Sequence, residues 1–244
     1  MARAGGGVIL ASTVVGPSTD WYLTRATGIV ALVLLSGNVA LGVLDVSRVS
    51  SPRWPRFVVD GLHRTVALLS VAFLLAHILT SVLDSFAPIG PLDAVIPFHS
   101  RYRPLWLGLG AVAFDLTIAV VITSVARERL GYRTWRAVHW LAYASWPVAL
   151  LHGLGSGSDT REHWLLAINA VCVLVVLGAV AARALQCWSV APRAAAIGVA
   201  GAVAFAGGVL IWLPDGPLGH DWAKRAGTPT TLLAPRPATG VARR

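Results

Sequence analysis

The sequence predicts an all-α membrane protein, a bundle of six transmembrane helices, and three observations lead to this prediction. Hydrophobic residues make up 56% of the 244 residues, charged residues make up only 13%, and the mean hydropathy is +0.69. A soluble domain carries about 25% charged residues. The apolar residues form six runs of about 20 residues, which is the length needed to cross a bilayer. A β-barrel would instead show strands of alternating polar and apolar residues.

The six predicted spans are separated by segments rich in turn-forming residues. We expect an extracytoplasmic N-terminal segment over 1–20, a six-helix domain over 21–213 and an extended, flexible extracytoplasmic tail over 214–244, because that tail is rich in Pro, Gly, Thr and Ala. The six spans cover residues 21–44, 61–83, 105–125, 135–154, 164–182 and 194–213.

The formal net charge of +9 comes from arginines in the loops, which indicates topology and lipid headgroup contacts rather than nucleic acid binding. Nine arginines lie in the loops after spans one, three and five, and three lie in the loops of the other face. Since positive loops stay in the cytoplasm, we expect a multi-pass plasma-membrane protein with both termini outside. The nine are Arg48, Arg53, Arg56, Arg127, Arg129, Arg133, Arg136, Arg183 and Arg193, and the three are Arg101, Arg103 and Arg161.

Four of the seven histidines lie inside predicted spans, as two matched sets. His63 and His77 are 14 residues apart in the second span, and His139 and His152 are 13 apart in the fourth. Fourteen residues are close to four helical turns and extend about 21 Å along the axis. Both spans run in the same direction, so the sequence predicts one histidine pair near the cytoplasmic face and one near the outer face.

Imidazole is a usual axial ligand of haem iron, and ionisable groups inside a membrane are costly enough to indicate function. We therefore expect two b-type haems between the second and fourth helices, one held by His63 with His139 and one by His77 with His152. A spacing of 13 leaves the fourth-span histidines out of phase on a straight helix. We expect Pro147 to kink that helix and to aim His152, in a frayed last turn, at His77.

At these residues the sequence resembles the ferric reductase-like transmembrane domain family. That family includes NADPH oxidases, ferric reductases and the haem-binding membrane subunit of the bacterial methionine sulfoxide reductase system. The His-x13-His and His-x12-His spacings resemble its two-haem branch, and the resemblance covers about 21–213. The segments over 97–106, 135–140 and 152–155 are similar to those of actinobacterial members that stand alone, without fused domains.

The resemblance implies electron flow from inside to outside by an oxidoreductase component, a cytochrome b, in which no catalytic residue is assigned. Oxidases of this family continue into flavin and nicotinamide domains, whereas this chain has a sixth span and no GxGxxG motif. We therefore expect a separate cytoplasmic flavin reductase or a membrane quinol as donor. The expected acceptor is an extracytoplasmic flavin or redox protein, dioxygen or a ferric chelate.

Haem propionates are anions that need cationic partners, and guanidinium groups bind carboxylates well. The predicted partners are Arg64 and Arg136 at the inner level and Arg25, Arg101 and Arg103 at the outer level. The resemblance supports Arg25, which matches an arginine on the corresponding helix of the oxidases. The alternative is that these arginines only reach toward the membrane interface.

Three further polar residues have no assigned role. Asp115 lies in the middle of the third span, and His99 and His163 lie in outer loops. Two other functions also stay open. The chain is alternatively a single-haem, quinol-linked membrane subunit of a periplasmic reductase, or a permease without haem whose histidines conduct a metal or bridge helices.

Overall fold

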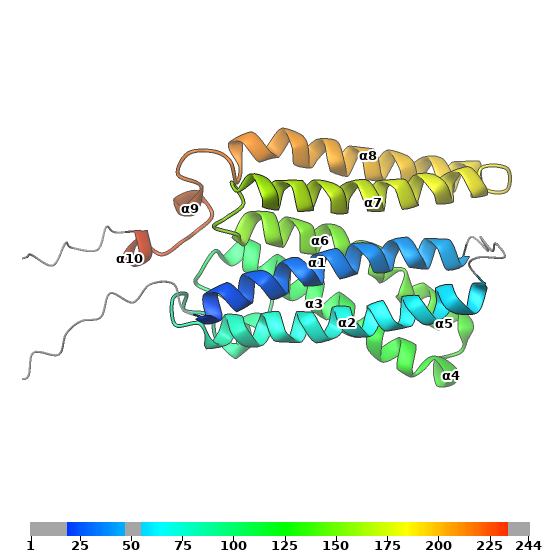
Figure 1. The fold of residues 1–244 in the computed structure, drawn as a ribbon, viewed down its shortest axis with the longest axis horizontal. Coiled ribbons are helices and arrows are strands. Elements are labelled where there is room, and N and C mark those ends of the chain that lie inside the picture. Colours follow the sequence, from blue (N-terminus) through cyan, green and yellow to red (C-terminus); the bar gives the residue numbers. More distant parts are fainter. Residues whose placement is uncertain (1–18, 47–54, 234–244) are drawn as a thin grey trace, which may run out of the picture.

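The computed structural model describes residues 19–46 and 55–233, which fold into an elongated bundle of α-helices with no β-strand among them (Figure 1). Five of the helices are long and apolar enough to cross a membrane, so the chain has the architecture of a multi-pass membrane protein. These five are α1 (Thr19–Val46), α2 (Arg56–Leu83), α3 (Pro104–Val125), α7 (His163–Cys187) and α8 (Pro192–Asp215).

The fourth predicted span is two helices rather than one. α5 (Tyr132–His139) and α6 (Leu141–Ser156) are separated by Trp140, and the short α4 (Arg127–Leu130) precedes them. The structure thus has five long apolar helices plus this broken segment, where we expected six continuous spans.

The helix is interrupted at a residue that the sequence analysis did not single out. α6 continues through Pro147, whereas the helix is interrupted at Trp140, directly after His139. There the Tyr143 N–H donates to the Trp140 carbonyl at 3.0 Å, a tighter bond between residues three apart. The tightened turn at Trp140 changes the helical phase between the two histidines of this segment.

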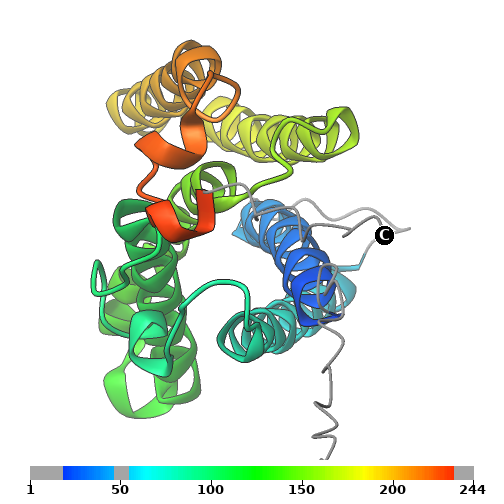
Figure 2. The ribbon, with the colours of Figure 1, turned by 90° about the vertical axis from the view of Figure 1, so that its left-hand side faces the viewer.

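The helices pack as two pairs with two further helices on one side. α1 packs on α2, α3 packs on α6, and α7 lies against α1 and α8. Figure 2 looks along the bundle and shows α1 and α2 beside each other, with α3 on the other side of α6. The core lies where α6 meets α1 and α7, around Trp146, Leu150, Leu154 and Cys172. Trp146, of which 5% is exposed, donates from Nε1 to the Ser36 hydroxyl of α1 at 2.8 Å.

The two ends of the bundle differ in composition. We call one the arginine-rich end, since it holds Arg127, Arg129, Arg133, Arg136, Arg183 and Arg193. The other, the terminal end, holds the start of α1, the end of α2, the 3-10 helix η1 (Pro91–Ala94), α9 (Trp222–Arg225) and α10 (Thr230–Leu233). Arg48 and Arg53 of the charge count, most of segment 1–20 and residues 234–244 lie outside the described residues.

Much of the tail that we predicted to be extended is packed on the terminal end. α8 continues to Asp215, and the chain then folds back over the start of α3 through α9. The Arg103 N–H donates to the Gly227 carbonyl at 3.0 Å. The prediction rested only on the composition of this segment, which does not reveal the tryptophan and backbone contacts that hold the segment on the bundle.

Candidate functional site

The structure brings together the histidines of each predicted pair. His77 of α2 and His152 of α6 lie with their ring centroids 6.2 Å apart and their planes at 78°. His63 of α2 and His139 of α5 lie 6.3 Å apart at 69°. The two pairs have nearly the same geometry at two depths of the bundle.

The rings of the pair at the terminal end are oriented by backbone carbonyls of neighbouring helices. Nδ1 of His77 lies 2.8 Å from the Thr24 oxygen of α1, and Nδ1 of His152 lies 2.8 Å from the Trp106 oxygen of α3. A carbonyl oxygen only accepts hydrogen bonds, so each Nδ1 donates. In a neutral imidazole the lone pair is then on Nε2, which is the arrangement of a metal-binding histidine.

The spacing within each pair fits one metal ion between two imidazoles. A metal–nitrogen bond is about 2.0 Å and the ring centroid lies about 1.15 Å behind Nε2, so two opposed imidazoles place their centroids about 6.3 Å apart. The two observed distances agree with this value. Among the described residues no group of three or more His, Cys, Asp or Glu gathers around a common point. A metal here would therefore need further ligands from a bound group.

Three glycines make room for the histidine rings. A Cβ at Gly28 of α1 would lie 2.9 Å from Nδ1 of His77, and one at Gly110 of α3 would lie 2.6 Å from Nδ1 of His152. A Cβ at Gly42 would lie 3.3 Å from Cε1 of His63. Sequence reasoning missed these glycines.

A cavity of about 780 Å³ opens at the terminal end, with both His77 and His152 in its lining. Its walls come from α1, α2, α3, α6 and α7 and are mostly apolar. Cofactor and ligand pockets have volumes of about 300–1,000 Å³ and are lined in this way. The polar groups of the lining include Arg25, Asp84 and Asp159.

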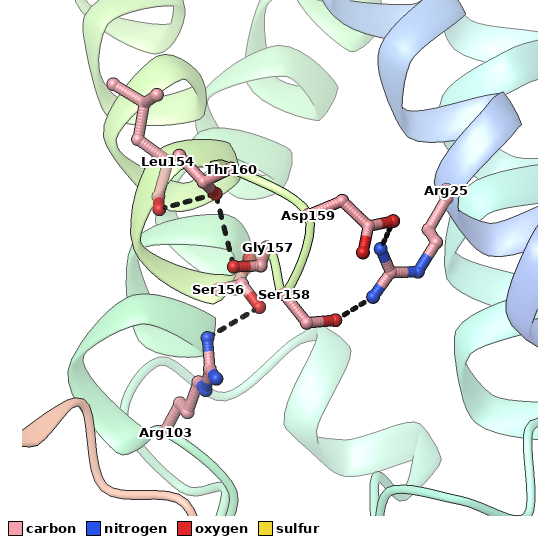
Figure 3. Close-up of polar contacts among 8 residues, drawn as sticks. All are labelled: Arg25, Arg103, Leu154, Ser156, Gly157, Ser158, Asp159 and Thr160. Atoms are coloured by element: carbon pink, nitrogen blue, oxygen red, sulfur yellow. Dashed lines mark hydrogen bonds and ion pairs between the residues drawn. The ribbon is translucent and has the colours of Figure 1, made fainter. Parts of the chain in front are cut away.

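Arg25 connects α1 to the loop after α6 at this cavity (Figure 3). Its guanidinium forms an ion pair with Asp159 and donates a hydrogen bond to the Ser158 hydroxyl. It also lies over the Trp21 ring, 3.6 Å from the centroid. Arg25 is therefore at the place where we expected a cation, and it already has protein partners that the sequence did not reveal.

Arg103 lies beside the end of α6, and only 3% of it is exposed. Its Nη1 donates to the Ser156 carbonyl at 2.9 Å (Figure 3) and to the Gly155 carbonyl at 3.1 Å. Its Nε donates to the Thr228 hydroxyl at 3.0 Å. Burial lowers the pKa of Arg103, and Tyr102 partly offsets this shift. The last turn of α6 is thus capped, where we expected it to be frayed.

The sequence pattern of one known family, described as the ferric reductase like transmembrane component, matches residues 27–150. The match spans half of the chain and includes His63, His77 and His139. The chain belongs to the ferric reductase-like transmembrane family. No solved structure matches it.

In this ferric reductase-like protein the remaining predicted arginines lie on the surface. Arg64, Arg101 and Arg136 are exposed, and the Arg136 guanidinium lies 5.8 Å from the centroid of the Tyr132 ring. The structure shows no anionic partner for these three among the described residues, so their contact with a cofactor stays a prediction.

The histidine pair at the arginine-rich end has an aromatic cover that the sequence did not indicate. The Trp135 ring stacks on His139 with centroids 4.9 Å apart at 29°, and the Arg127 guanidinium lies 4.8 Å from the Trp135 centroid. Nδ1 of His139 is buried and has no hydrogen-bond partner within the described residues. The stacked indole thus orients the ring of His139, as the backbone carbonyls orient the rings of His77 and His152.

The three residues without an assigned role belong to neither histidine pair. Asp115 is exposed in the middle of α3, and His163 is exposed at the start of α7. His99 has its Nδ1 2.7 Å from Oδ1 of Asp93, which is buried and lines the cavity. None of the three is a member of a larger group of metal-ligating side chains in the described part of the chain.

Proposed function

We propose that this ferric reductase-like protein transfers electrons across the membrane through two b-type haems, each held by one histidine pair. The observation that carries the proposal is the spacing of the rings, 6.2 and 6.3 Å between centroids at two depths. That spacing fits an iron with an imidazole on each side.

In this proposal His63 and His139 hold one haem, and His77 and His152 hold the other. Haem supplies one-electron redox chemistry at its iron. Two histidines at each site would hold the iron from both sides and leave no position for a substrate. This favours electron transfer over substrate chemistry at the metal.

The surrounding residues hold each ligand in its binding orientation. The carbonyls of Thr24 and Trp106 fix which nitrogen of His77 and His152 carries the proton. Gly28 and Gly110 let the rings lie against α1 and α3 without a clash. These contacts would hold the rings in the orientation that a haem iron needs, so little rearrangement of the two side chains would accompany its binding.

Polar groups at the rim of the cavity suit the carboxylates of a haem. Arg25 lines the cavity and supplies a guanidinium there. We propose that Arg25 contacts a propionate, with Arg101 and Arg103 as the further candidates at this end and Arg64 and Arg136 at the other.

The charge distribution supports a direction across the plasma membrane. The arginine-rich end lies in the cytoplasm in our proposal and the terminal end lies outside, following the bias of positive charge in loops. A separate flavin reductase or a membrane quinol then donates at the arginine-rich end. The acceptor at the terminal end is a ferric chelate or an extracytoplasmic flavin or redox protein.

Alanine variants of single histidines test the assignment. Purified His77→Ala or His152→Ala protein should lose the haem of the terminal end and keep the other, so the haem extracted per chain halves. His163→Ala serves as the control, since this histidine is exposed at the start of α7. If His77→Ala keeps the full haem content and an unchanged spectrum, the proposed pairing is wrong.

A further inference from the structure

We propose that segment 216–228, between α8 and α10, is a positioning element for His152 and so controls the coordination of the haem at the terminal end. The inference rests on the proposed function. The segment lies outside the region that matches the family, and none of its residues lines the cavity. It acts through the end of α6 and through Trp106.

The first connection runs to the carbonyls at the end of α6. The last carbonyls of a helix have no partner within the helix and need donors from elsewhere. The Gly155 carbonyl accepts from Nε1 of Trp222 at 3.2 Å as well as from Arg103. Gly155 lies three residues after His152, so these bonds hold the turn that carries the histidine.

Arg103 is itself held by the segment. Its backbone N–H donates to the Gly227 carbonyl and its Nε donates to the Thr228 hydroxyl, both at 3.0 Å. Gly227 has a φ of +90° and a Cβ there would lie 2.9 Å from Cδ of Pro104. Only glycine allows this close approach of the segment to the start of α3.

The second connection runs through the tryptophan whose carbonyl accepts from His152. The Trp106 ring stacks on Trp212 of α8 at 5.1 Å and packs against Trp222 of α9 at 5.3 Å between centroids. A side chain at Gly155 would overlap the Trp106 ring, so the ring lies directly on the last turn of α6. The segment thus fixes both the carbonyl acceptor and the helix turn of one ligand.

This arrangement has a consequence that is specific to one of the two haem sites. Without the contacts of Trp222 or Thr228, the last turn of α6 would loosen and His152 would be held less firmly opposite His77. A haem bound there would then become open to a small external ligand. His63 and His139 lie at the opposite end of the bundle, so their site stays closed.

Carbon monoxide binding to the dithionite-reduced, full-length protein measures this opening, because a haem with two bound histidines offers no free position. We expect no binding in the wild type and binding at one of the two haems in Trp222→Ala and Thr228→Val. The midpoint potential of that haem should shift by about 59 mV, a tenfold change in the one-electron equilibrium constant. Thr228→Ser keeps the hydroxyl and should restore wild-type behaviour.

Trp188→Ala is the matched control, since Trp188 is an exposed tryptophan that follows α7 at the other end of the bundle. Loss of one haem with retention of the other in Trp222→Ala also supports the inference. Two haems with wild-type potentials and no carbon monoxide binding in both variants would overturn it, as would equal effects on both haems. A wild-type protein that binds no haem would instead overturn the proposed function.

Discussion

The imidazole of His77 lies directly against Gly28, where a Cβ would come within 2.9 Å of Nδ1. The same nitrogen donates to the carbonyl of Thr24, one helical turn earlier in α1. Gly110 and Trp106 of α3 have the same relationship to His152. Each ligand of the terminal end is therefore held by a carbonyl and a glycine four residues apart on a neighbouring helix.

Adding a methyl group at these glycines should displace the rings. In Gly110→Ala the Cβ would lie 2.6 Å from Nδ1 of His152, so we expect the haem content to fall from two per chain toward one. Gly28→Ala should have a smaller effect in the same direction. Gly37→Ala in α1 is the control, because nothing lies within 4 Å of a Cβ there. Normal haem content in Gly110→Ala would contradict the model of a tightly fitted ring.

The ion pair of Arg25 and Asp159 should influence the potential of the haem at the terminal end. Both side chains line the cavity. Asp159→Asn removes a negative charge that stabilises the more positive oxidised haem, so the midpoint potential should rise. The expected rise corresponds to a roughly threefold to tenfold larger equilibrium constant for one-electron reduction of this haem. Potentiometric titration of both haems checks this. Glu128→Gln, which is exposed in α4 at the arginine-rich end and outside the cavity lining, should leave the potential of the haem at the terminal end unchanged. A fall in potential in Asp159→Asn would contradict the prediction.

The hydrogen bond between Trp146 and Ser36 should stabilise the packing of α6 on α1. Ser36→Ala leaves the buried indole N–H without its acceptor. Hydrogen bonds between membrane helices contribute about 0.6 to 1.7 kcal/mol, so the free energy of unfolding in detergent should fall by about that amount. Ser70→Ala is the control, since the Ser70 hydroxyl bonds only to the Val66 carbonyl of its own helix among the described residues. An equal loss in both variants would show that the contact between the helices contributes nothing.

The Trp135 ring should shield the haem site at the arginine-rich end. Trp135→Leu removes the ring stacked on His139 and admits water. Water stabilises the charged oxidised form, so the midpoint potential of this haem should fall. The expected fall corresponds to an equilibrium constant for one-electron reduction that is smaller by roughly threefold or more. Trp140→Leu provides a control, because the exposed Trp140 packs on Tyr143 rather than on His139. A change confined to the other haem would show that the histidine pairs are assigned to the wrong sites.

The positions of five of the six predicted spans and the pairing of the histidines could be predicted from the sequence. Apolar runs of about 20 residues determine the spans, and the spacing of 14 between His63 and His77 puts both on one helix face. The spacing of two glycines matches that of these histidines. Gly28 and Gly42 are 14 residues apart as well, and antiparallel packing of α1 on α2 places each beside one histidine.

Other features depend on contacts between segments far apart in the chain. The ion pair of Arg25 with Asp159 and the docking of Trp222 on Gly155 follow from tertiary packing. We expected a kink at Pro147, since proline removes a helical hydrogen bond, and α6 continues through this residue as one helix. A helix nevertheless accommodates a proline where neighbouring groups compensate, and composition alone gives no information about such neighbours.

The ratio of haem to protein in the purified wild type tests the central claim most directly. Pyridine haemochrome analysis combined with a reduced-minus-oxidised spectrum should give two b-type haems per chain, and both should be six-coordinate and unreactive toward carbon monoxide. One haem per chain would contradict the paired arrangement, and a colourless protein that takes up no added haem would contradict electron transfer through these histidines altogether.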